Sequence, residues 1–154
     1  MSFPEPQKVS TYVTWASVAT AKPAPSTETW EDLEPRLDQE LWDMAERLSA
    51  SSGIRSRDLK YFLNHVARLW WYRGSCSFSN KVMAELCGFG NNSWARGRAA
   101  AIVKALIDNG LLDLIRKGST HHWSVYQPRW ENWGPILSSR WSGQTSQDAL
   151  KLGS

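Results

Sequence analysis

Residues 79–112 read SNKVMAELCGFGNNSWARGRAAAIVKALIDNGLL and predict two helices joined by a short turn rich in Gly and Asn. Ser79 can cap the first helix, because its hydroxyl accepts a bond from an N–H group without a helical partner. Ser93 can cap the second helix, and Gly110 ends it. Apolar residues at helical spacing give each helix a buried face: Val82, Met83 and Leu86 in the first, and Ala95, Ala99, Ile102, Val103 and Leu106 in the second.

The segments on either side of these two helices complete a recognisable layout. A leading helix has the inner face Leu59, Phe62, Leu63, Val66 and Trp70, and Ser75–Phe78 is a candidate edge strand. After the second helix, Leu111–Ile115 and His122–Tyr126 predict a hairpin whose turn is Arg116–Thr120. This order is the layout of a winged helix-turn-helix, a fold that mostly places one helix in the major groove of DNA. The expected fold class is therefore mainly α with a small β-hairpin and an N-terminal helical extension.

The segment Lys60–Tyr126 resembles the winged helix-turn-helix domains of phage and plasmid replication-initiation proteins. The resemblance lies in the leading helix LKYFLNHVARLWWYRG, the segment CSFSNKVMAELCGF, the helix end ALIDNGLLDLI and a wing that ends in Tyr126. This chain has Phe78 where the family usually has Pro. The resemblance implies a DNA-binding protein that acts as a replication initiator or as a transcriptional regulator, and these two roles are not separated by the sequence.

The helix Ser93–Asn109 is expected to enter the major groove of double-stranded DNA. Arg98 can bond a guanine edge, and Lys117 at the hairpin tip can approach a phosphate. The alternative for the helix is a solvated charged face, and the alternative for the tip is an ordinary polar turn. The expected DNA contacts are Asn91, Asn92, Ser93, Trp94, Arg96, Arg98 and Lys104 near the helix, and Arg116 and Lys117 in the wing.

Charge divides the chain into an acidic and a basic part. Residues 1–55 hold five Lys or Arg and nine Asp or Glu, whereas residues 56–130 hold eleven and four. The basic part coincides with the expected winged helix-turn-helix domain, residues 56–130, and suits a polyanionic partner. Residues 1–26, rich in Pro, Ser, Thr and Ala, are expected to be flexible. Residues 131–154 are expected to form a polar, Trp-containing tail that is loose after Trp133.

Residues 29–50 form an acidic helical extension in this interpretation. Thr29 and Asp32 suit a capping box, and Pro35 is expected to kink the helix or start a second one. Ser49–Gly53 is expected to be a linker. An apolar stripe must be buried on the core or on a second copy of the chain, and the second choice predicts a homodimer. The stripe comprises Leu37, Leu41, Met44, Ala45 and Leu48.

The ten tryptophans admit several interpretations. Trp70, Trp71 and Trp123 are expected in the core or half-buried. Trp130, Trp133 and Trp141 are expected to clamp over the domain; the alternatives are a docking surface for another protein and stacking on single-stranded bases.

Other chemistry finds little support in the sequence. The two cysteines, Cys76 and Cys87, are expected to be buried free thiols, and no spacing of Cys, His and Asp resembles a metal site. No nucleophile elbow, P-loop or paired-carboxylate motif is present, so neither an enzyme nor a cofactor is expected. No apolar run is long enough for a membrane span, and a cytoplasmic location is the default expectation.

The alternative function is a protein-binding adaptor, or an inhibitor of a nucleic-acid enzyme, that uses Trp94 and the acidic region Glu28–Glu46.

Overall fold

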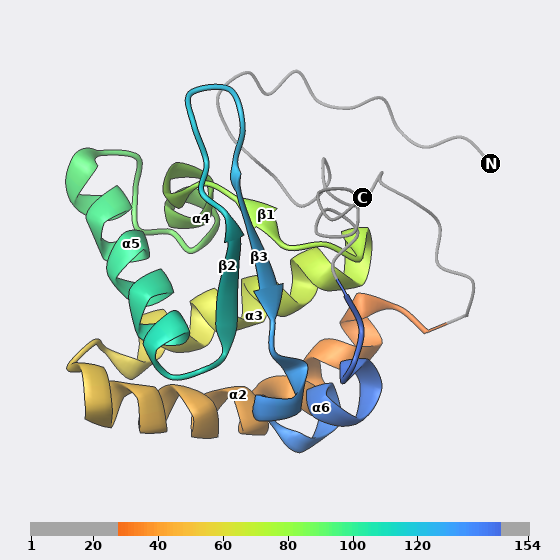
Figure 1. Ribbon diagram of the computed structural model, residues 1–154. Coiled ribbons are helices and arrows are strands. Elements are labelled where there is room, and N and C mark those ends of the chain that lie inside the picture. The colour runs from red at the N-terminus through yellow and green to blue at the C-terminus, as the bar shows by residue number, and fades with distance from the viewer. Residues whose placement is uncertain (1–27, 146–154) are drawn as a thin grey trace.

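Helices dominate the computed structural model, which describes residues 28–145, and a small antiparallel sheet lies among them (Figure 1). The expected flexible segment, residues 1–26, lies outside the described residues. The elements are α2 (Trp30–Ser52), α3 (Ser56–Arg73), β1 (Ser77–Phe78), α4 (Asn80–Leu86), α5 (Ser93–Asp108), β2 (Leu112–Arg116), β3 (Ser124–Pro128), the 3-10 turn η1 (Trp130–Asn132) and α6 (Pro135–Trp141). The predicted class, mainly α with a small β component, is confirmed.

Helix α2 begins at the predicted capping box. The Thr29 hydroxyl accepts a bond from the Asp32 N–H at 3.2 Å, and the Asp32 carboxylate accepts the Thr29 N–H at 3.0 Å. Pro35 does not start a second helix, because α2 continues through it from Trp30 to Ser52. Its missing N–H leaves one carbonyl without a donor, near the start of the helix. The predicted linker Ser49–Gly53 is also corrected, since the helix continues to Ser52 and ends at Gly53 with φ 76°.

The apolar stripe of α2 is buried within the single chain. Helix α2 lies along α3, and the two helices share one hydrophobic core (Figure 1). All five stripe residues are at most 5% exposed. Of the two predicted choices the structure shows the first, since α3 and its neighbours already cover the stripe, and the stripe gives no support to a homodimer through residues 29–50.

The segment after β3 packs back onto α2 instead of forming a loose tail. Trp130, Trp133 and Trp141 are all buried, and Trp130 lies 4.7 Å from each of the other two rings by centroid. The buried Glu40 carboxylate of α2 accepts the N–H groups of Ile136 (2.8 Å) and Leu137 (3.1 Å) at the start of α6. The prediction of a loose tail after Trp133 is thus wrong for residues 135–145, and the predicted tryptophan clamp is confirmed.

The sheet has the strand order β1-β3-β2 and is antiparallel throughout. Ser77 pairs with Val125, and Leu114 pairs with Tyr126 before a bulge toward Arg116. The predicted strands differ from the observed ones by up to two residues. His121 and His122 lie exposed in the loop before β3, so the strand predicted from His122 begins instead at Ser124.

The two predicted helices of residues 79–112 are α4 and α5. The Ser79 hydroxyl accepts the Val82 N–H at 3.1 Å, as predicted. The second cap is corrected from Ser93 to Asn92, whose side-chain oxygen accepts the Ala95 N–H at 2.8 Å. Gly110, with φ 75°, follows α5 and allows the Leu111 N–H to bond the Leu106 carbonyl at 2.9 Å. The predicted buried face of α5 is confirmed in full.

Candidate nucleic-acid interface

The outward face of α5 carries several small residues over its first two turns, beside the exposed Trp94 and Arg96. Ser93, Gly97, Ala100 and Ala101 are exposed along this face, and the exposed Lys104 follows them. A Cβ atom added at Gly97 would meet nothing within 4 Å. The face is therefore open, and its backbone is accessible to a flat or grooved partner.

Polar side chains surround the start of α5. Asn91 and Asn92 are exposed in the turn, but Asn92 uses its side-chain oxygen to cap the helix. Arg96 is exposed and donates to the Asn91 carbonyl at 3.1 Å, a surface contact that an external acceptor can replace. The first turn of a helix also has positive potential from its unpaired N–H groups. This end of α5 therefore suits an anion.

Arg98, one of the predicted DNA contacts, makes its contacts within the chain. Its guanidinium pairs with the Asp58 carboxylate in the first turn of α3, and it lies over two rings, 4.4 Å from the Phe89 centroid and 4.7 Å from that of Trp94. Both charged side chains are largely buried, with 25% of Arg98 and 12% of Asp58 exposed. One guanidinium nitrogen of Arg98, Nη2, is thus already paired with Asp58 in this structure.

Lys104 remains available on the outward face. Its ammonium contacts the Asp108 carboxylate at 2.7 Å, and 75% of its side chain is exposed. An exposed pair four residues apart on a helix contributes only about 0.3–0.5 kcal/mol. A phosphate can therefore take the place of Asp108 at little cost.

The hairpin between β2 and β3 lies at the same end of the molecule as the first turn of α5 (Figure 1). Arg116 and Lys117 are exposed there. Gly118 is needed by the hairpin itself, because a Cβ would lie 2.6 Å from the Ser124 nitrogen and 2.7 Å from the His122 oxygen. The Gly118 N–H donates to the Ser124 hydroxyl at 2.8 Å. The two cations are thus carried on a tight, internally bonded turn.

Three large apolar residues on the hairpin were not among the predicted contacts. Leu114, Ile115 and Trp123 are 46%, 43% and 40% exposed. Successive residues of a strand face opposite sides, so the adjacent Leu114 and Ile115 could have signalled that at least one is exposed. Trp123, expected in the core or half-buried, is not in the core, and the Arg73 guanidinium lies 6.0 Å from its ring centroid. Asp58 was also missed, because a partner 40 residues from Arg98 leaves no local pattern.

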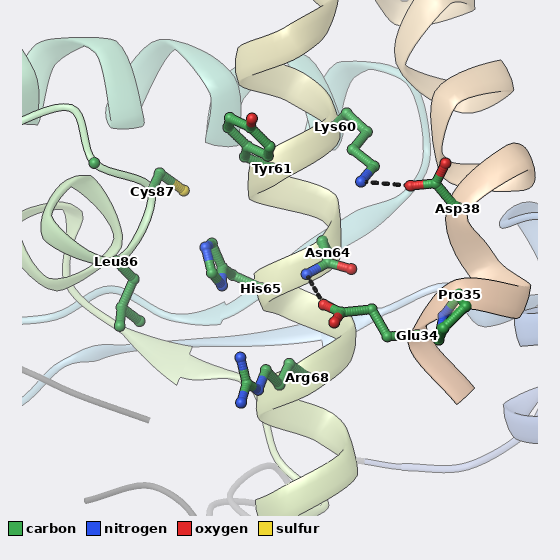
Figure 2. A pocket seen from close by; sticks show the side chains of 11 residues that line it. Glu34, Pro35, Asp38, Lys60, Tyr61, Asn64, His65, Arg68, Leu86 and Cys87 are labelled. Atoms are coloured by element: carbon green, nitrogen blue, oxygen red, sulfur yellow. Dashed lines mark hydrogen bonds and ion pairs between the residues drawn. The ribbon is translucent and has the colours of Figure 1, made fainter. Parts of the chain in front are cut away.

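A separate cavity of about 700 Å³ lies between α2, α3 and the end of α4 (Figure 2). Lys60 contacts Asp38 at 2.8 Å, and the Asn64 amide donates to Glu34 at 2.8 Å, so the charged groups on its walls are paired across the two helices. Burial and, secondarily, the charge of Arg68 lower the pKa of His65 to about 4. Burial raises the pKa of the Cys87 thiol. At neutral pH this cavity therefore holds a neutral imidazole and a protonated thiol.

Among the described helices, none has both the length and the apolar character that crossing a bilayer requires. Comparison with protein-family models, curated proteins and solved structures found no match for this chain.

Proposed function

We propose that residues 56–130 form a winged helix-turn-helix domain that binds double-stranded DNA with α5 in the major groove. In this assignment α3, α4 and α5 are the three helices, and the β2–β3 hairpin is the wing. The excess of eleven basic over four acidic residues in this segment supports a polyanionic partner. The resemblance to replication-initiation proteins supports a role in replication or transcription of a phage or plasmid.

The observation that carries the proposal is Gly97. A glycine inside a helix costs roughly 0.5–1 kcal/mol relative to alanine. Gly97 has neither a positive φ nor a neighbour within 4 Å of an added Cβ, so nothing within the described residues requires it. Close approach of an external surface would explain why this position is a glycine. The small residues beside it, Ser93, Ala100 and Ala101, extend the same open face.

Cations surround this open face on the side of the wing and along the helix. Arg96 and Lys104 contact DNA from α5, and Arg116 and Lys117 contact phosphates of the adjacent backbone from the hairpin. Asn91 and Ser93 at the exposed start of α5 add polar donors and acceptors for a phosphate or a base edge. Arg98, which is paired with Asp58, makes no direct contact with DNA in this proposal.

A selection from random duplexes with the purified full chain tests the proposal. Enrichment of a defined sequence is the expected result. A recovered palindrome favours a dimeric regulator, and direct repeats favour a replication initiator. Absence of any enrichment, with a folded protein at low salt, contradicts the proposal.

A second candidate is a protein-binding adaptor, and the exposed hairpin residues favour it. Leu114, Ile115 and Trp123 present apolar surface where a phosphate-contacting wing needs polar groups. Replacing Leu114 and Ile115 by Thr separates the two candidates. Duplex binding is retained if the wing acts through Arg116 and Lys117, whereas a partner bound through the apolar patch is lost.

A further inference from the structure

We propose that Trp94 recognises the methyl group of a thymine in the major groove, and that Asp58 and Arg98 hold its ring in place for this contact. The inference rests on the proposed DNA-binding function and assigns one determinant of its sequence preference. It replaces the guanine contact first expected of Arg98.

Trp94 is the most exposed of the large apolar side chains among the described residues, at 66%. It belongs to the first turn of α5 and borders the open face around Gly97. A ring at this position projects toward whatever the start of the helix approaches. In a helix-turn-helix complex, the start of the second helix is the part that contacts base edges.

The Trp94 ring is supported despite its exposure. The Arg98 guanidinium lies one helical turn further along, 4.7 Å from the Trp94 centroid, and it also covers Phe89. Stacking of a guanidinium on an aromatic face is favourable, and Trp gives the strongest such contact. Asp58, on α3, fixes the other side of the guanidinium by an ion pair. The contacts from Asp58 to Arg98 and from Arg98 to Trp94 thus restrict the indole ring before any partner binds.

The base edges in the major groove of DNA indicate which group an apolar ring can recognise. Thymine is the only base that presents a methyl group at the major-groove edge, and apolar side chains contact it there. The broad indole face offers more apolar area than the alanines beside it. Stacking on an unpaired base is the competing use of an exposed ring, and it predicts a preference for single strands over duplexes.

The test uses the duplex recovered by selection and replaces each thymine in turn by uracil, which removes only the methyl group. At one position the unmodified chain is expected to lose affinity roughly fourfold, the effect of burying one methyl group. The Trp94→Ala variant is expected to bind the thymine and uracil duplexes equally. Trp123→Ala, which removes an exposed tryptophan of the hairpin, serves as the control and retains the discrimination.

Asp58 and Arg98 are positioning residues, and the thymine-to-uracil ratio is the readout that a purely structural role would not move. Asp58→Asn and Arg98→Lys are expected to reduce this ratio toward one. Asp113→Asn removes the acid of another Asp–Arg pair, with Arg129, and leaves the ratio unchanged. A ratio that survives in Asp58→Asn overturns the positioning role.

The two proposals fail in different ways. If no duplex is bound, DNA binding itself is contradicted. If a duplex is bound but no thymine shows a Trp94-dependent methyl effect, only the role of Trp94 is overturned. Tighter binding to the corresponding single strand, lost in Trp94→Ala, assigns the ring to base stacking and also overturns the inference.

Discussion

Gly97 is the residue whose substitution separates folding from binding most cleanly. Gly97→Ala is expected to stabilise the chain by about 1 kcal/mol, because alanine favours a helix and the added Cβ meets nothing. Gly97→Gln is expected to leave thermal stability at or above that of the natural chain and to weaken duplex binding more than tenfold. The long side chain would keep the helix away from the groove floor.

Ala50→Gln is the matched control, because it places the same side chain on an exposed position of α2. Thermal unfolding and a duplex titration on the three variants give both readouts. Undiminished duplex affinity in Gly97→Gln would mean that the open face of α5 does not approach DNA.

His65 makes the stability of the chain depend on pH. Its pKa lies at about 4 in the folded chain and near the ordinary value of 6.5 when unfolded. Between these values only the unfolded chain takes up the proton, so stability is full above pH 6.5 and falls as the pH drops toward 4. A difference of this size corresponds to about 3 kcal/mol of unfolding free energy.

Urea unfolding of the natural chain and His65→Gln at pH 7 and pH 4.5 checks this expectation. The variant should lose less stability than the natural chain over that interval, because it lacks the buried imidazole. Equal losses in the two proteins would assign the acid sensitivity to other groups.

Sequence reasoning succeeded for residues whose role is local. The Ser79 cap, the Thr29–Asp32 box and Gly110 were all predictable, because each acts within a few positions along the chain. The burial and pairing of Arg98 could not be predicted in the same way. Its ion pair with Asp58 joins two helices, and only their packing brings the charges together.

At the scale of elements, α6 is the feature that the sequence concealed. Its seven residues lie in a segment whose polar composition suggested a loose tail. Its start is capped from α2 by Glu40, 96 and 97 residues away from the N–H groups that it accepts. Gly134 makes this possible, because a Cβ there would lie 2.6 Å from the Glu40 carboxylate. A cap supplied from so far along the chain has no sequence signature.

Glu40→Ala is expected to destabilise the chain by about 1–3 kcal/mol, because it leaves the buried Leu137 N–H and the partly buried Ile136 N–H without an acceptor. Glu40→Gln keeps one acceptor oxygen and should cost less. Glu46→Ala, an exposed position on the same helix, is the control and should change stability little. Chemical denaturation measures all three, and equal stability of Glu40→Ala and Glu46→Ala would refute the capping role.

For the whole molecule, the sequence predicted the order of elements but not how they close on one another. The sequence showed the apolar stripe of α2, but a stripe indicates only that another apolar surface covers it. Whether that surface is α3 or a second copy of the chain depends on tertiary packing. The clamp of Trp130, Trp133 and Trp141 was predicted, but the elements that it covers were not. The positive charge of residues 56–130 was readable directly, because net charge needs no fold.

The central claim is that the α5 face and the wing bind double-stranded DNA. The most direct measurement is the affinity for a selected duplex between roughly 50 and 200 mM salt. Each counterion that binding releases from the DNA makes the affinity fall more steeply with salt concentration. The natural chain should lose affinity tens-fold or more over this range. In Arg96→Ala/Lys104→Ala/Lys117→Ala, the slope of log affinity against log salt should fall by about three, one for each lost phosphate contact. A flat response in the natural chain, or a slope that the triple substitution leaves unchanged, would contradict the claim.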